Sequence, residues 1–189
     1  MQQAVAAQEA GTDYIGLIMA PGRRQVSPET ARRICQAVKR VECVGVFVDA
    51  PLAVVRELAA YCGFDRVQLH GQETAGYCEA IGIPYIKSFV VDNQLPDEAA
   101  LAAYKNGLFL VDSGSGSGIP FDWQSCAVLP EQLRQNNMLL AGGLQADNVQ
   151  AAIRTAKPLG VDVSSGVETN GEKDLGKIAA FIRMVRQGG

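Results

Sequence analysis

The sequence predicts an α/β protein of the (β/α)8 TIM-barrel type, missing its first strand, with seven strands readable. Three observations predict this fold. Seven apolar runs alternate with helix-like segments, one helix-like segment precedes the first run, and glycine-rich turns follow the last two. Most runs are continuous, as is typical of parallel strands buried on both faces. An open doubly wound sheet would instead place its glycine-rich turn after the first strand, so the late glycines favour a barrel.

The expected strands are apolar runs bounded by turn residues. They are predicted at residues 14–19, 41–49, 66–70, 85–91, 108–112, 138–143 and 160–165.

The expected helices fill the segments between these runs, and the first one precedes residue 14. Ser27 and Pro28 predict the start of the next helix, because serine favours the N-cap and proline fits the first helical position. Asp49 and Pro51 are expected to begin the third helix in a similar way. The remaining helices are predicted at about 73–81, 97–105, 122–135, 146–156 and 172–187.

Length and charge limit the domain count and the partners. The chain has 189 residues, 48% hydrophobic and 20% charged, which predicts a single domain over residues 1–189. The net charge of −3 weighs against nucleic acid or an anionic membrane as the main partner. No run approaches the roughly 18 apolar residues of a membrane span. A phosphorylated small molecule remains compatible, because backbone N–H groups bind phosphate without net positive charge.

Cysteine and histidine usage indicates compartment and metal content. The five cysteines are scattered without a CxxC pair, which predicts reduced thiols in a cytoplasmic protein. The first residues lack the basic and apolar segments of a signal peptide. A single histidine and dispersed cysteines give no metal-ligand spacing, so we expect no metal.

Two glycine clusters follow the last two predicted strands. Gly142 and Gly143 lie in AGGL, and Ser165 and Gly166 lie in SSGVE. Bare glycines let an oxyanion approach backbone N–H groups closely. Either cluster alone also fits an ordinary tight turn. Their succession on the last two strands, where barrels commonly bind phosphate, predicts a phosphate site.

Four further side chains are candidates because active sites of this fold lie at the C-terminal strand ends. Asp112 ends an apolar strand and suits a general acid, or alternatively caps a helix or fixes a loop. Arg24 suits bidentate binding of a carboxylate, or alternatively is a solvated loop arginine. His70, the only histidine, fits a structural hydrogen bond as well as catalysis. Asp162 lies inside an apolar run and must be paired or hydrogen-bonded there.

Taken together, these segments resemble the phosphoribosylanthranilate isomerase family. The matching strings cover nearly the whole chain in the family's order: EAGTDYIGLIMAP, RRQVSPETAR, VGVFVDAP, VQLHG, GSGSGIPFDW, LLAGGL and VDVSSGVE. The resemblance implies a cofactor-independent Amadori rearrangement in tryptophan biosynthesis. Its substrate would be N-(5′-phosphoribosyl)anthranilate and its product 1-(2-carboxyphenylamino)-1-deoxyribulose 5-phosphate.

The resemblance also implies a role for each candidate. Asp112 would protonate the ribose ring oxygen as general acid, and Arg24 would engage the anthranilate carboxylate. His70 and Asp162 are expected to bind substrate. The phosphate would be held by the glycine-rich segments, at Gly116, Gly118, Gly142, Gly143, Ser165 and Gly166.

The sequence departs from the family at its start. In the family the first strand reads like KICG and its cysteine is the general base, whereas here Met1 falls in the expected first helix. None of the five cysteines stands in the matching context. One hypothesis is an isomerase whose sequence begins too late. The other is a non-catalytic or decayed phosphate-ligand-binding barrel. A missing strand would leave an exposed barrel edge, through which a homo-oligomer is expected to form.

Overall fold

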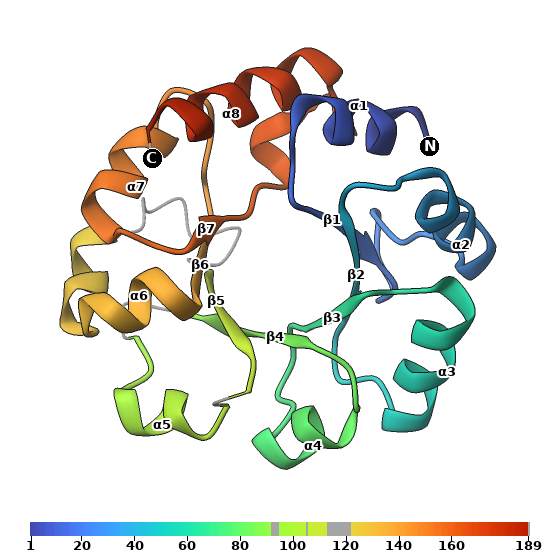
Figure 1. The fold of residues 1–189 in the computed structure, drawn as a ribbon, viewed down its shortest axis with the longest axis horizontal. Helices are drawn as coiled ribbons and strands as arrows, with labels where there is room; N and C mark the ends of the chain where they lie inside the picture. The colour runs from blue at the N-terminus through green and yellow to red at the C-terminus, as the bar shows by residue number, and fades with distance from the viewer. Residues whose placement is uncertain (92–94, 105, 113–121, 189) are drawn as a thin grey trace. The chain divides into compact units, whose positions relative to one another are not determined.

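The computed structural model alternates helices and parallel strands along the chain, as Figure 1 shows. It describes residues 1–91, 95–104, 106–112 and 122–188. Strands β1 to β7 are hydrogen-bonded in chain order, which confirms the seven predicted strands. Two compact units divide the chain, Met1–Ser88 and Phe89–Gly189. The boundary falls within strand β4 (Tyr85–Val90).

The first unit holds three complete strands, the start of β4, and four helices. Parallel pairing joins β1 to β2, β2 to β3 and β3 to β4. Helices α2, α3 and α4 lie on one side of these strands (Figure 1). The elements are α1 (Gln2–Ala10), β1 (Tyr14–Ile18), α2 (Pro28–Ala37), β2 (Glu42–Phe47), α3 (Leu52–Cys62), β3 (Arg66–Leu69) and α4 (Ala75–Ala80).

Strand β2 is the centre of packing in the first unit. Its residues from Cys43 to Phe47 are all buried. The rings of Phe47 and Phe64 meet edge to face with centroids 6.3 Å apart. Gly45 makes this packing feasible, because a Cβ at that position would overlap the Phe64 ring. The continuous apolar run of β2 therefore reflects burial on both faces.

The two predicted helix starts in the first unit have different outcomes. Ser27 caps α2, accepting the N–H of Thr30 at 3.2 Å, and Pro28 is the first helical residue, as predicted. The prediction for α3 is wrong, because Pro51 itself occupies the N-cap position. Asp49 has a left-handed backbone with φ of 47°, and its carboxylate accepts the N–H of Gln72 at 2.6 Å instead of capping α3.

The described residues of the second unit form three further parallel strands and a short antiparallel hairpin. Strand β5 pairs with β6, and β6 with β7. The elements are α5 (Glu98–Ala102), β5 (Leu108–Asp112), η1 (Trp123–Val128), α6 (Glu131–Asn137), β6 (Met138–Ala141), α7 (Val149–Ala156), β7 (Gly160–Val161), η2 (Ser165–Val167), β8 (Glu168–Thr169), β9 (Glu172–Lys173) and α8 (Leu175–Gln187).

Three predicted boundaries in the second unit are wrong. The helix expected at 122–135 is a 3-10 helix and an α-helix separated at Pro130, which has no N–H to continue the first. The strand expected at 160–165 ends at Val161, because the chain turns into η2, and Asp162 is exposed beyond it. The helix expected from residue 172 begins at Leu175, where the Asp174 carboxylate accepts the N–H of Lys177 at 3.1 Å.

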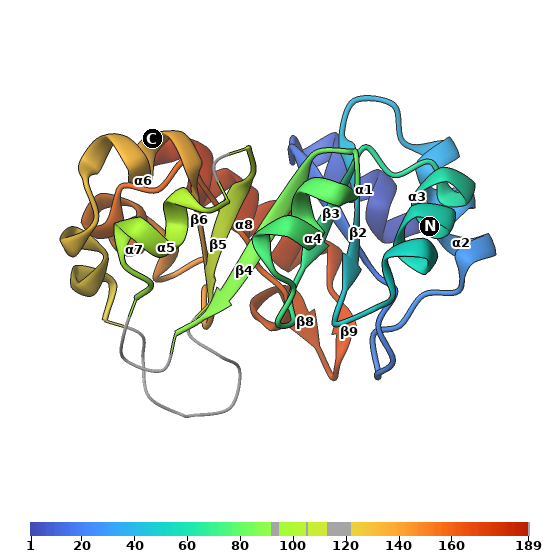
Figure 2. The same cartoon turned by 90° about the horizontal axis from the view of Figure 1, so that it is seen from below.

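The hairpin β8–β9 connects η2 to α8 and was not predicted. Figure 2 shows it projecting from the lower edge of its unit. Asn170 and Gly171 form its two-residue turn with φ of 53° and 83°. Two positive φ values are typical of the type I′ turn that matches strand twist.

No helix among the described residues is both long enough and apolar enough to cross a membrane.

Candidate functional site

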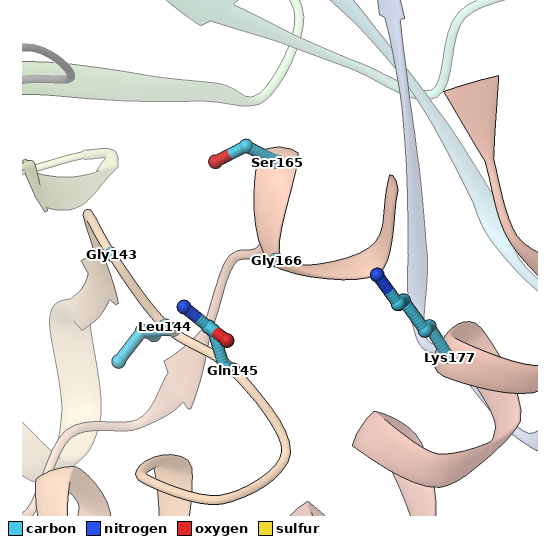
Figure 3. Close-up of a pocket in the computed structure, with 6 residues that line it drawn as sticks. All are labelled: Gly143, Leu144, Gln145, Ser165, Gly166 and Lys177. Atoms are coloured by element: carbon cyan, nitrogen blue, oxygen red, sulfur yellow. The ribbon is translucent and has the colours of Figure 1, made fainter. Parts of the chain in front are cut away.

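A cavity of about 240 Å³ lies in the second unit, beyond the ends of β6 and β7. Figure 3 shows the residues that line it, which we call the glycine pocket: Gly143, Leu144, Gln145, Ser165, Gly166 and Lys177. Three of the predicted phosphate-binding residues therefore line one cavity. Gly142 directly precedes Gly143, one of these residues, in the chain. Gly116 and Gly118 lie outside the described residues.

The turn after β6 presents open backbone to the glycine pocket. Gly142 and Gly143 have left-handed φ values of 89° and 62°. Asn148 closes the turn from both sides, because its Oδ1 accepts the N–H of Gln145 at 2.8 Å and its Nδ2 donates to the Gly143 carbonyl at 3.0 Å. No atom lies within 4 Å of where a Cβ on Gly143 would stand. Open space beside the backbone is what an anion needs to approach it.

The turn at η2 packs directly against the turn after β6. A Cβ on Gly166 would overlap the carbonyl oxygen of Leu144, so glycine is required there for steric reasons. Ser165, the residue before it, is exposed. The two predicted glycine clusters thus form one continuous wall.

Two lysines that sequence reasoning missed lie beside this wall. The Lys177 ammonium group donates to the Glu168 carbonyl at 2.7 Å and borders the glycine pocket. The Lys173 ammonium group donates to the Ser164 carbonyl at 2.8 Å and to the Glu168 carboxylate at 3.0 Å. The four-residue spacing of these lysines after SSGVE was the available signal, but an exposed cation at a helix start is common on any surface.

Asp112 is the last residue of β5 and is half-buried. In the sheet it is level with Ala141, the residue before Gly142. Its carbonyl accepts the N–H of Val91 at 2.8 Å. Asp112 therefore lies at the same strand-end edge as the turn that begins at Gly142. Asp162, also in this unit, donates its backbone N–H to the Leu140 carbonyl at 2.8 Å.

Arg24 and His70 belong to the first unit. Arg24 is half-buried in the segment between β1 and α2, where the Val26 N–H donates to the Ile18 carbonyl at 2.8 Å. His70 follows β3 directly and is also half-buried. Its ring Nδ1 lies 3.3 Å from the side-chain nitrogen of Gln68. Both residues lie beyond the C-terminal ends of their strands, as predicted.

A buried ion pair in the first unit was not predicted. The Lys87 ammonium group lies 2.9 Å from a Glu73 carboxylate oxygen, and these side chains are 4% and 2% exposed. Lys87 also donates to the carbonyls of Leu69 and Gly71 at 3.3 and 2.5 Å. The Glu73 carboxylate accepts the backbone N–H groups of Asp49 and Gly71, each at 2.9 Å. This Glu73–Lys87 pair ties together the segments after β2 and β3.

The charge state of Glu73 follows from these contacts. Burial alone raises the pKa of its carboxyl group, but the hydrogen bonds from Lys87 and from the Asp49 N–H outweigh burial and hold the pKa below its ordinary value. Glu73 is therefore ionised at neutral pH, and Lys87 is its counter-ion.

The five cysteines are free thiols. Burial raises the pKa of Cys78 and of Cys126 to about 11, which leaves both protonated at neutral pH. Cys43 is the second residue of β2 and is buried. The hydrogen bond between Cys43 and Cys35 raises the pKa of Cys35 and lowers that of Cys43.

Comparison with known proteins identifies the family. Residues 1–184 match the family described as N-(5'phosphoribosyl)anthranilate (PRA) isomerase. The N-(5'-phosphoribosyl)anthranilate isomerase of Desulforamulus reducens is 44% identical over 190 residues, covering 97% of this chain and 89% of the relative. That of Desulforudis audaxviator is 42% identical over 195 residues, covering 99% and 94%.

Solved structures agree with the sequence comparison. The phosphoribosyl anthranilate isomerase of Thermotoga maritima superposes with a TM-score of 0.87 at 35% identity, covering 98% of this chain and 94% of the other. A second isomerase structure holds reduced 1-(o-carboxyphenylamino)-1-deoxyribulose 5-phosphate and superposes with a TM-score of 0.83 at 34% identity, covering 98% and 93%. These matches confirm the predicted family and fold class: the chain belongs to the N-(5′-phosphoribosyl)anthranilate isomerase family.

Proposed function

We propose that this chain isomerises N-(5′-phosphoribosyl)anthranilate to 1-(2-carboxyphenylamino)-1-deoxyribulose 5-phosphate in tryptophan biosynthesis, without a cofactor. The observation that carries this proposal is the glycine pocket, formed by two consecutive strand-end turns in a chain of this family. A solved relative that holds the reduced product analogue supports a phosphorylated ligand of this kind.

In the proposed reaction Asp112 is the general acid. Its proton passes to the ribose ring oxygen as the bond from that oxygen to C1′ breaks, and the anthranilate nitrogen lone pair forms a C=N bond. A base then removes the C2′ proton, which gives an enolamine that tautomerises to the ketone. Arg24 binds the anthranilate carboxylate, while His70 and Asp162 contact the substrate. Positioned acid and base groups of this kind typically contribute about 10²–10⁴-fold each.

The phosphate is proposed to bind in the glycine pocket. Backbone N–H groups in the turns at Gly142–Gly143 and Ser165–Gly166 are the proposed donors, and Gly116 and Gly118 are proposed to complete the site. The open space at Gly143 supports this assignment. Anchoring the phosphate holds the ribose in a fixed orientation, so that the acid meets the ring oxygen.

The general base is the point on which the two functional hypotheses differ. Residues 1–189 contain no KICG segment, and we assign the base role to none of the five cysteines. Buried Cys78 and Cys126, with pKa values raised to about 11, have little thiolate at neutral pH. The alternative is therefore a barrel that binds the phosphorylated ligand without turnover.

One assay separates these hypotheses. The 189-residue chain and the same chain preceded by a KICG strand are purified and assayed for isomerisation. We expect the longer form to turn over about 10²–10⁴ times faster, since only it carries the base. Equal activity in both forms would contradict the assigned base, and inactivity in both would favour the binding protein.

We also propose a cytoplasmic protein that folds as one domain over residues 1–189 and self-associates through an exposed edge of the barrel. An unpaired strand edge carries backbone donors and acceptors that a second chain can satisfy. Sedimentation velocity measures the association, and a single unfolding transition by both circular dichroism and tryptophan fluorescence would support one domain.

A further inference from the structure

We infer that Lys177 binds the substrate phosphate through its ammonium group, as the side-chain cation of the glycine pocket. This inference rests on the proposed function, because it takes the phosphate site there as given. The Lys177 ammonium group would add a full positive charge to a site otherwise assigned to backbone N–H groups.

The position of Lys177 supports this role. Of the six residues that line the glycine pocket, it is the one that carries a charge. It lies in the first turn of α8, and its exposed side chain reaches back to the Glu168 carbonyl. In Figure 3 the Lys177 side chain extends from α8 toward the turn that carries Ser165 and Gly166.

The neighbouring lysine shows why Lys177, rather than Lys173, is the ligand. The Lys173 ammonium group is 3.0 Å from the Glu168 carboxylate, which neutralises its charge, and it also donates to the Ser164 carbonyl and hydroxyl oxygens. Within the described part of the chain, the recorded acceptor of Lys177 is a carbonyl, which carries no net charge. A phosphate dianion is a stronger acceptor, so an ammonium group in this position gains by binding it.

The two lysines therefore have different roles in the proposed site. Lys173 fixes the ends of the Ser164–Glu168 segment and so positions the Ser165 and Gly166 backbone. Lys177 supplies charge. An ammonium group adds a full positive charge to the backbone N–H donors, which favours the phosphomonoester dianion over an uncharged sugar.

Inorganic phosphate is the probe for this inference, with the 189-residue chain and titration calorimetry at pH 7.5. Lys177→Gln keeps a side-chain N–H donor and removes the positive charge; we expect about tenfold weaker binding of phosphate. Lys177→Arg keeps the charge and is expected to stay within about threefold of wild type. Arg183→Met, on the same helix but outside the lining of the pocket, removes one charge and is the matched control; we expect it to bind within about twofold of wild type.

The outcomes separate this inference from the proposed function. Wild-type binding with an unchanged Kd in Lys177→Gln would overturn the role of Lys177 and leave the pocket assignment intact. Equal weakening in Lys177→Gln and Arg183→Met would also overturn it, because the effect would then come from net charge. No binding by the wild type would contradict the phosphate site itself. Circular dichroism spectra that match wild type establish that each variant is folded, and Lys177→Arg tests the charge if Lys177→Gln is not.

Discussion

The Glu73–Lys87 pair and the glycine pocket both join two segments that follow neighbouring strands, but they do so by different contacts. Each lies where segments leave the C-terminal ends of neighbouring strands, and each brings two such segments together. In the first region a lysine is sealed inside with its own carboxylate. In the second, backbone contact at Gly166 joins the turns and the lysine stays exposed. The buried counter-ion makes the first contact a permanent brace, whereas the exposed Lys177 ammonium group donates to a carbonyl and stays accessible to a ligand.

The largest expected effect on stability comes from removing one partner of the Glu73–Lys87 pair. Lys87→Met removes the counter-ion and leaves the Glu73 carboxylate buried and uncompensated, which should lower the free energy of unfolding by about 3–5 kcal/mol. Urea denaturation followed by circular dichroism measures the loss.

Two controls sharpen that test. Lys177→Met, at the exposed lysine, should change the free energy of unfolding by about 0.5 kcal/mol or less. The double variant Glu73→Gln/Lys87→Met removes both charges but keeps an acceptor for the Asp49 and Gly71 N–H groups, and should regain part of the loss. Equal losses in Lys87→Met and Lys177→Met would refute the contrast between the two regions.

The next effect concerns the contact between the two turns of the glycine pocket. Gly166→Ala places a Cβ on the Leu144 carbonyl oxygen, and the wall must shift. We expect a loss of about 3 kcal/mol in the free energy of unfolding, because backbone cannot give way as a side chain does. Thermal and urea denaturation measure it, and a stability equal to wild type would show that the turns are not in close contact.

A smaller effect is expected at Gly143, where the constraint is conformational. Its Cβ would enter open space, so Gly143→Ala should cost only about 1 kcal/mol, the strain of a left-handed alanine. Gly143→Asn is the matched variant, since asparagine tolerates this conformation better. Urea denaturation should rank asparagine above alanine; the reverse order would contradict a conformational cause.

The smallest effect is the pH dependence that Glu73 contributes. Its folded pKa is lower than the ordinary value of 4.5, so its stabilisation is fully present above pH 4.5 and is lost as the pH falls through the folded pKa. Burial opposes the hydrogen bonds, so the net contribution is small. Urea denaturation between pH 7 and pH 3 should show less acid sensitivity in Glu73→Gln/Lys87→Met than in wild type.

The sequence predicts the parts of this molecule that depend on local pattern. Apolar runs that alternate with helix-like segments predict all seven strands, and Ser27 with Pro28 predicts the start of α2. The two glycine clusters, AGGL and SSGVE, locate the wall of the cavity. These features follow from periodicity, capping and backbone freedom, which neighbouring residues determine.

What the sequence does not predict depends on contacts between distant residues. Glu73, in the segment between β3 and α4, is 14 positions from Lys87 on β4, and nothing in the apolar run YIKSFV indicates which acid its lysine contacts. Asp162 lies inside the run GVDV, yet it falls outside the strand and is exposed, because pairing with β6 ends at Val161. Asp49 lies where a helix cap is expected from the sequence, but its carboxylate accepts the N–H of Gln72, which follows β3.

The exposure of Lys177 also bears on how fast ligand arrives. The chain carries a net charge of −3, so a phosphate ester is repelled at long range and attracted only near the pocket. Physiological salt screens interactions beyond about 8 Å, which weakens the distant repulsion more than the close attraction. The association rate should therefore respond less to ionic strength than that of a uniformly cationic surface. If Lys177 binds phosphate as proposed, its ammonium group beside backbone N–H donors lets a protein of net charge −3 bind an anion.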